Sequence, residues 1–164
     1  SNKIYQMLEK ISTEVKILFR FYSNILNDWT IETIWASIID EKEGKYKLDN
    51  IPFYAPVSCG DIISAEFDQD EGRLVYKETI EHSGNSTIQV IVAKNESIEN
   101  LRDMFKLLGC DSEKFSDSYF VMEIPAAISY VSIREKLNYL EEENIISYAE
   151  PNLSKNHGTK TLVG

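Results

Sequence analysis

The stretch His82-Ser83-Gly84-Asn85-Ser86-Thr87 lies near the middle of the chain and separates two different sequence patterns. Before it, short runs typical of β-strands alternate with polar turns; after it, strands alternate with helices. A Gly-Asn pair between small hydroxyl residues favours a tight corner, because glycine accepts positive φ and short polar side chains bond to nearby backbone groups. We therefore predict that this stretch is an ordered junction between two structural units.

A catalytic interpretation of the same stretch is the alternative, because His82 stands beside Ser83. Residues adjacent in sequence seldom face each other in the way that a nucleophile and its base must. The sequence therefore favours a structural role for the junction.

Composition indicates a globular protein. The chain has 164 residues, of which 43% are hydrophobic and 11% aromatic, enough for the core of one domain or of two small subdomains. No apolar run approaches the roughly 20 residues of a membrane helix, and no signal-peptide pattern is visible. We expect a cytoplasmic protein that does not bind a membrane.

The charge balance is strongly acidic, with 27 Asp and Glu against 17 Lys and Arg and a formal net charge of −10. A phosphate backbone is bound by Lys and Arg side chains that displace counterions, so nucleic acid is an unfavourable partner. The acidic excess is spread over both halves of the chain. It serves either solubility or the recognition of a cationic partner.

The N-terminal half has the pattern of an all-β unit. Apolar spacing indicates a short helix or extension over residues 1–13, and residues 14–82 are predicted to form a bent antiparallel sheet or partial β-barrel. Pro52 and Pro56 interrupt the strands with an irregular segment. The expected strands are Glu14 to Tyr22, Thr30 to Ile39, Lys45 to Leu48, Ile62 to Phe67 and Arg73 to Ile80.

Residues 83–153 are predicted to form a ferredoxin-like α/β sandwich, which makes the fold class α+β. Ser97 is the expected N-cap of a first helix that ends before Gly109, and the spacing of Ser132 and Glu135 predicts a capping box for a second. The expected strands are Thr87 to Ala93, Tyr119 to Ile124 and Ile145 to Ala149, with one more between Cys110 and Ser118. Residues 154–164 are predicted to be a flexible tail.

Side chains for cofactor or metal chemistry are sparse. The seven glycines are scattered, which argues against a phosphate-binding loop, and the two histidines, His82 and His157, lie far apart. Cys59 and Cys110 are also distant from each other, and both are expected to be reduced and buried, with Cys59 unreactive. We predict no cofactor, no metal and no catalytic residue.

Several motifs resemble a bacterial family known only as a domain of unknown function, number four-two-six-five. The similarity runs from about Val15 to Leu153. It implies a bacterial soluble domain, without established catalytic residues, and some acidic relatives of this size look like immunity proteins encoded beside secreted toxins. The motifs are Asn50-Ile51-Pro52-Phe53-Tyr54-Ala55, Val57-Ser58-Cys59-Gly60-Asp61, Ser83-Gly84-Asn85-Ser86-Thr87 and Leu108-Gly109-Cys110.

Two functions are expected on these grounds. The first is a non-enzymatic immunity protein that covers the active site of a cognate toxin, with a basic nuclease as one class of target. Acids of the second hairpin would pair with Lys and Arg of that toxin. These partner-binding candidates are Asp68, Asp70, Glu71, Glu78 and Glu81.

The alternative is a small-molecule-binding protein or enzyme that uses the groove where the two halves meet. Its polar lining would be His82, Ser83, Asn85 and Asp61. The sequence does not determine the oligomeric state.

Overall fold

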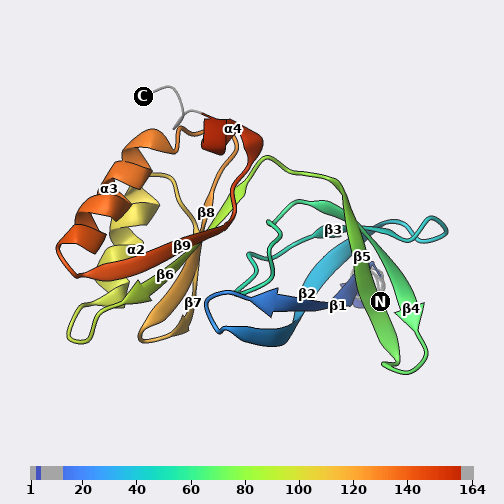
Figure 1. The fold of residues 1–164 in the computed structure, drawn as a ribbon. Coiled ribbons are helices and arrows are strands. Elements are labelled where there is room, and N and C mark those ends of the chain that lie inside the picture. The colour runs from blue at the N-terminus through green and yellow to red at the C-terminus, as the bar shows by residue number, and fades with distance from the viewer. Residues whose placement is uncertain (1–2, 5–12, 160–164) are drawn as a thin grey trace.

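Five strands of the N-terminal half form a closed barrel in the computed structural model, which describes residues 3–4 and 13–159 (Figure 1). Consecutive strands pair antiparallel. A short parallel pairing, Ile17 with Leu74 and Leu18 with Val75, closes the ring. The expected antiparallel unit is present, but the barrel is closed because β1 pairs with β2 along one edge and with β5 along the other. The strands are β1 (Glu14–Ser23), β2 (Asp28–Asp40), β3 (Lys45–Leu48), β4 (Ile62–Asp68) and β5 (Arg73–Glu81).

Alternation along β1 and β2 produces the barrel core. Ile17 and Phe19 on β1 and Ile34 and Ala36 on β2 are buried and belong to one hydrophobic cluster, because side chains two residues apart share a face of a strand. The ring of Phe19 stacks on Tyr76 at a centroid distance of 4.6 Å. The opposite face of β2 points outward.

The C-terminal half is a four-stranded antiparallel sheet of order β7-β8-β6-β9 with two helices between its strands. The additional strand expected between Cys110 and Ser118 is β7. The elements are β6 (Ser86–Val92), α2 (Ile98–Leu107), β7 (Ser112–Ser116), β8 (Tyr119–Ile124), α3 (Val131–Glu142), β9 (Ile146–Asn152) and α4 (Lys155–Thr159).

Helices α2 and α3 cover the face of this sheet that points away from the barrel (Figure 1). Ile88 and Val90 of β6, Phe105 of α2 and Leu137 of α3 are fully buried in a second hydrophobic cluster. The other face of the sheet is therefore left to meet the barrel.

Local signals set the ends of α2 but not those of α3. The Ser97 hydroxyl accepts a hydrogen bond from the Asn100 N–H (3.2 Å), and Gly109 has a φ of 96°, so both predicted caps are confirmed. The predicted capping box of Ser132 is wrong, because α3 begins at Val131 with Tyr130 as its N-cap. The buried ring of Tyr130 fixes the start of the helix two residues earlier.

The predicted flexible tail begins with a short helix. Lys155–Thr159 form α4, and the side chain of His157 is 98% buried, which corrects the prediction for this part of residues 154–164. Residues 160–164 and most of the predicted extension over 1–13 lie outside the described residues. Among the residues that are described, no helix has the length and apolar character needed to cross a membrane.

Candidate partner-binding groove

The loop between β3 and β4 lies where the two halves meet. The Glu32 carboxylate on β2 accepts hydrogen bonds from three consecutive backbone N–H groups of this loop, those of Phe53 (2.7 Å), Tyr54 (3.0 Å) and Ala55 (2.9 Å). Charge-assisted bonds of this kind are among the stronger ones in proteins. The loop is therefore fixed to the barrel by a single acidic side chain.

The same loop is bonded to the sheet of the other half. The hydroxyl of Thr87 on β6 donates to the Val57 carbonyl at 3.0 Å and lies 3.0 Å from the Ser58 hydroxyl. The amide of Asn152 on β9 donates to the Ser58 oxygen at 2.7 Å, and the hydroxyl of Tyr119 donates to the loop carbonyl of Phe53. Ser58 and Thr87 are buried, so these bonds join the halves inside the protein.

The predicted junction forms an ordered corner. Gly84 has a φ of 89°, and the Asn85 N–H donates to the Ser83 hydroxyl at 3.1 Å. The Asn85 side chain donates to the Cys59 carbonyl (3.0 Å) and accepts from the Ala126 N–H (2.9 Å). The expected bonds from side chain to backbone are therefore confirmed, and they connect the junction to both halves.

The alternative ligand site contributes to the same corner. His82, Ser83 and Asn85 line a hollow of about 350 Å³. Asp61 does not line it, because its buried carboxylate accepts hydrogen bonds from the backbone N–H groups of Ser58 (3.0 Å) and Ser83 (2.8 Å). The structure thus brings three of the four predicted residues together and uses the fourth beneath them as a structural acceptor.

A serine–histidine pair that the sequence does not reveal lies behind the junction. Ser86 Oγ is 2.6 Å from His157 Nδ1, and His157 Nε2 lies 3.1 Å from the Ile128 carbonyl. Because a carbonyl can only accept, Nε2 carries a proton, and in the neutral imidazole Nδ1 then accepts from the Ser86 hydroxyl. Both side chains are buried, and Ser86 also accepts from the Ser154 N–H. The pair anchors α4 to β6.

The five predicted partner-binding acids do not form one cluster. At the turn, the Asp68 carboxylate accepts from the backbone N–H groups of Asp70 and Glu71, and Glu71 pairs with Arg20. Glu81 ends β5, eight residues from Arg73 at its start; at about 3.3 Å per residue this is the opposite end of the hairpin.

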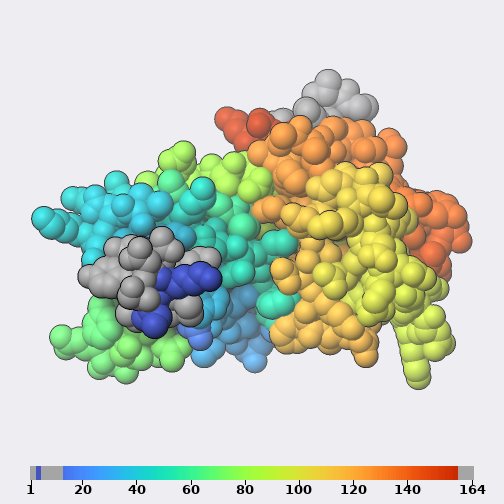
Figure 2. Space-filling view, turned by 180° about the vertical axis from the view of Figure 1, so that it is seen from behind, coloured from blue at the N-terminus to red at the C-terminus, as the bar shows by residue number. Residues whose placement is uncertain are grey.

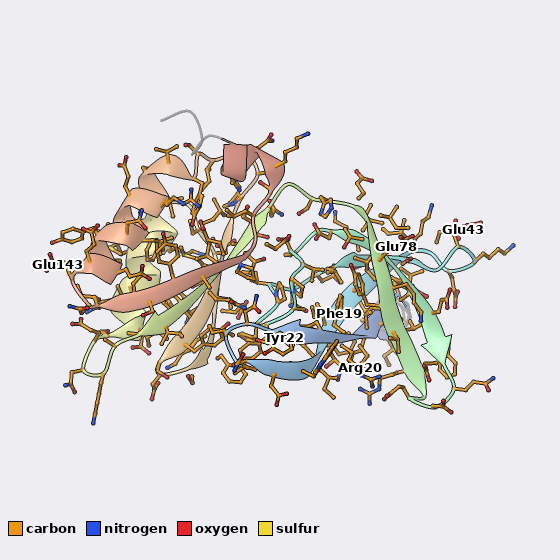
Figure 3. The ribbon with its side chains drawn as sticks, in the orientation of Figure 1. Phe19, Arg20, Tyr22, Glu43, Glu78 and Glu143 are labelled. Carbon is orange, nitrogen blue, oxygen red and sulfur yellow. The ribbon has the colours of Figure 1, made fainter. Side chains whose placement is uncertain are left out.

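Glu78, near that far end, points out from β5, and Arg20 lies lower on the barrel in the same view (Figure 3). Asp70, Glu78 and Glu81 are exposed. Within residues 13–159, no ion pair involves any of these three. They remain available to a partner, whereas Asp68 and Glu71 hold the turn together.

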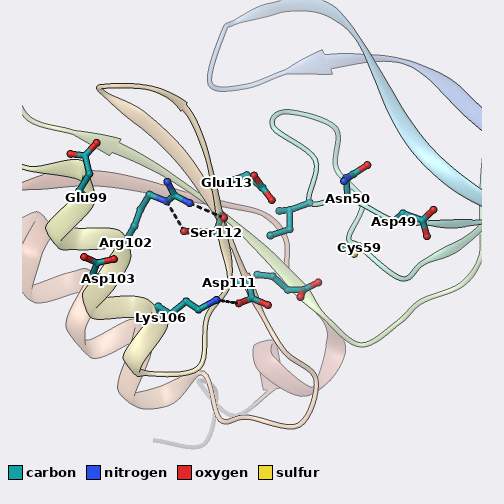
Figure 4. A pocket seen from close by; sticks show the side chains of 12 residues that line it. Asp49, Asn50, Cys59, Glu99, Arg102, Asp103, Lys106, Asp111, Ser112 and Glu113 are labelled. Carbon is teal, nitrogen blue, oxygen red and sulfur yellow. Dashed lines mark hydrogen bonds and ion pairs between the residues drawn. The ribbon is translucent and has the colours of Figure 1, made fainter.

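A larger concentration of acids lies in a groove between the two halves. Seen from behind, the teal loop of the barrel lies against the yellow and gold segments of α2 and β7 (Figure 2). The groove has a volume of about 510 Å³ and is lined by six carboxylates and two basic side chains (Figure 4). The acids are Asp49, Glu99, Asp103, Asp111, Glu113 and Glu123, and the bases are Arg102 and Lys106.

Both basic side chains of the groove have partners on their own half. Arg102 donates from Nε to the Ser112 hydroxyl at 2.8 Å and from its guanidinium to the Ser112 carbonyl at 3.1 Å. Lys106 pairs with Asp111 at 2.9 Å. Among the described residues, Asp103 and Glu113 have no ion-pair partner. The groove therefore carries a surplus of negative charge.

Glu123 on β8 lies in the wall of the groove with one oxygen buried. Its Oε1 has no hydrogen-bond partner among the described residues. Burial, together with the negative charges of Asp111 and Asp61, raises the pKa of Glu123 above its ordinary value. A carboxyl group in this situation lacks a hydrogen-bond donor.

Cys59 also lines the groove, and its surroundings disfavour the thiolate. Burial and the negative charges of Glu123, Asp49 and Asp61 raise the pKa of the Cys59 thiol to about 11. The thiolate, which is the nucleophilic form, is therefore scarce at neutral pH. Cys110 is fully buried, whereas Cys59 is only half-buried, and neither forms a disulfide.

Sequence patterns alone do not point to this groove, because its lining comes from five separate stretches of the sequence that only the fold brings together. In the part of the chain that the structure describes, no three His, Cys, Asp or Glu side chains are placed to hold a metal ion.

Comparison with known proteins gives a family and a related fold. A family model described as "Domain of unknown function (DUF4265)" matches residues 32–148, which include Glu32, the loop and the junction. The fold is similar to "Novel crystal structure of a hypothetical protein from Neisseria gonorrhoeae", with a TM-score of 0.74 and 24% identity over 86% of this chain and 96% of that chain. No curated protein matches the chain.

Proposed function

We propose that this chain, which belongs to the family described as Domain of unknown function (DUF4265), is a non-enzymatic immunity protein that neutralises a basic protein toxin in the cytoplasm. The observation that supports this proposal is the groove between the halves, where six carboxylates face two basic side chains that already have partners. Such a surface attracts Lys and Arg side chains of a partner.

Long-range electrostatics favour the same class of partner. The net charge of −10 produces a negative field around the whole protein, which speeds the approach of a basic protein and makes the rate depend on salt. The exposed acids Asp70, Glu78 and Glu81 on the hairpin contribute to this field. In this proposal they steer the encounter, and the groove holds the bound partner.

A rigid groove suits tight inhibition. The Glu32 bonds fix one wall, the loop, and the bonds of Thr87 and Asn152 hold that wall against the sheet. A binding surface that is already ordered loses little conformational entropy when a partner arrives. Inhibition follows if the bound partner's basic active-site face is covered.

Three of the four candidate groups of the alternative site, Asp61, Ser83 and Asn85, have structural roles, which supports a binding function over an enzymatic one. The carboxylate of Asp61 and the hydroxyl of Ser83 accept backbone N–H groups, and His157 is buried against Ser86. Cys59 is held as a thiol by its raised pKa.

The test is co-expression with the product of the gene immediately upstream. We expect the two proteins to co-purify and the chain to protect cells from growth arrest caused by that product. If they neither co-purify nor protect, the immunity proposal is wrong.

We also infer that the C-terminal half is a ferredoxin-like sandwich. In support of this assignment, its elements follow the order strand, helix, strand, strand, helix, strand, and its sheet order is β7-β8-β6-β9 with every neighbouring pair antiparallel.

A further inference from the structure

We infer that the groove binds an extended protein segment in which a cationic side chain is followed, two residues later, by an apolar one. This inference rests on the proposed function and specifies the chemistry of the partner. Two adjoining hollows support it, one acidic and one beside an exposed tryptophan.

The acidic hollow favours a Lys or Arg side chain of a partner. Asp103 on α2 and Glu113 on β7 line it without ion-pair partners among the described residues. Glu123 lines the same hollow with an unbonded carboxyl oxygen. A donor cation entering here would meet charges that the protein itself leaves unbalanced.

The second hollow continues from the first and has a different character. It has a volume of about 250 Å³ and shares Asn50, Ile51 and Glu113 with the acidic hollow. Trp35, which is 46% exposed on the outer face of β2, is among the residues that line it. An exposed aromatic side chain beside a groove is typical of an interface anchor.

Charge at the second hollow favours an apolar occupant over another cation. The ammonium group of Lys16 already lies 4.9 Å from the centroid of the Trp35 ring. The Glu32 carboxylate, also in the lining, is used by three backbone N–H groups of the loop. Glu113 is the remaining acid of this lining, and it is shared with the acidic hollow. A second positive charge would therefore meet Lys16 and compete for Glu113 with the cation in the first hollow.

The spacing of the two side chains follows from the shared wall. In an extended chain, residues i and i+2 point to the same side about 7 Å apart. The two hollows adjoin, because their linings share Asn50, Ile51 and Glu113, so neighbouring side chains on one face of an extended segment are the pair expected to enter them. A partner segment of the form cation–any residue–apolar would fill both.

Trp35 provides the measurement, because Trp29 is the only other tryptophan in the sequence. The Trp29→Phe variant, altered at a side chain that is 70% exposed, leaves Trp35 as the sole indole reporter. We would titrate it with the peptide acetyl-Gly-Arg-Thr-Leu-Gly-amide and with versions carrying Gln for Arg or Gly for Leu. A saturable change in Trp35 fluorescence is expected with the first peptide, and about tenfold weaker binding with each of the others.

Matched charge variants identify the site in the same background. Asp103→Asn combined with Glu113→Gln should weaken binding of the Arg peptide about tenfold. Glu78→Gln combined with Glu81→Gln removes the same charge from the hairpin and should leave binding within about twofold, because screening attenuates distant surface charges.

The inference is wrong if no saturable change occurs at millimolar peptide, if the three peptides bind alike, or if the two double variants behave alike. A Trp35 signal that changes with protein concentration alone would instead make the hollow a contact between two copies and would also overturn it. These outcomes can be distinguished from the outcomes of the growth-protection test of the proposed function. Growth protection without peptide binding would refute this inference and leave the immunity proposal intact. Peptide binding without growth protection would refute the toxin as the partner and leave the preference of the groove for this segment intact.

Discussion

The hydroxyl oxygens of Ser58 and Thr87 lie 3.0 Å apart at the centre of the contact between the barrel and the sheet. Both residues are buried, and each has a further bond across the junction: Thr87 donates to Val57, and Ser58 accepts from Asn152. These two hydroxyl groups therefore couple the loop that forms one wall of the groove to the sheet that carries the other.

Thr87→Val tests how much this contact contributes to the free energy of unfolding. Valine keeps the shape of threonine but leaves the Val57 carbonyl without its donor in a buried site, so the free energy of unfolding should fall by about 1–3 kcal/mol. Urea denaturation measures the change. Thr33→Val, at an exposed position of β2, is the control and should change stability little. Equal effects of the two substitutions would mean that the junction bonds do not stabilise the fold.

Glu32→Gln should loosen the loop. One carboxylate oxygen accepts from both Tyr54 and Ala55 and the other from Phe53, and a glutamine NH₂ group must replace one of these acceptors. We expect a loss of about 2 kcal/mol in the free energy of unfolding, because the bonds are charge-assisted.

Hydrogen exchange at the amides of Phe53, Tyr54 and Ala55 provides the specific readout for this variant and should accelerate. Glu66→Gln, on the exposed surface of β4, removes the same charge and should leave that exchange unchanged. Unaltered protection of the three amides in Glu32→Gln would refute the anchoring role.

Alanine substitutions at two glycines distinguish the loss of stability caused by backbone strain from the loss caused by a steric clash. Gly84 and Gly72 have positive φ values of 89° and 68°, so alanine is strained at either position by about 1 kcal/mol. A Cβ at Gly84 would also lie 2.9 Å from the Ala126 side chain, whereas one at Gly72 would meet nothing within 4 Å. Gly84→Ala should therefore be more destabilising than Gly72→Ala by about 1–3 kcal/mol in thermal or urea unfolding. Similar losses would show that the corner at the junction is not closely packed.

Several features of the fold follow from local sequence, and the groove does not. Ser97 and Gly109 delimit α2 through bonds and dihedral angles within a few residues, and the turn residues around Lys45–Leu48 bound β3 as predicted. Barrel closure depends on pairing of Ile17 with Leu74, which no local pattern encodes.

Predictions from the sequence are wrong where burial outweighs a local motif. The spacing of Ser132 and Glu135 fits a capping box, yet the buried Tyr130 starts α3 earlier. His157 follows a polar segment without apolar periodicity, and its partner Ser86 is 71 residues away. The acids of the groove likewise become neighbours only through the fold.

Glu123 should give the protein a specific pH dependence. Because the pKa of Glu123 is raised above its ordinary value of 4.5, the folded protein binds this proton more tightly than the unfolded chain. The stability that protonated Glu123 contributes is therefore fully present below pH 4.5 and is lost as the pH rises through the raised pKa.

Glu123→Gln removes this titration. The variant should be more stable than the parent at neutral pH, by about 1 kcal/mol, since no buried charge is formed there. Below pH 4.5 the advantage should disappear, because the parent carboxyl is then neutral as well. Urea unfolding of both proteins across this range measures the difference. A difference that does not vary with pH would contradict the role of burial at Glu123.

The groove, and not the hairpin, is proposed to hold a basic protein partner. The most direct test is the dissociation constant of the complex with the co-purified partner, measured by calorimetry for two variants of equal charge. Asp103→Asn with Glu113→Gln should weaken the complex at least about tenfold, whereas Glu78→Gln with Glu81→Gln should change it by no more than about twofold. The opposite order, or equal losses in both variants, would contradict the assignment of the groove as the binding site.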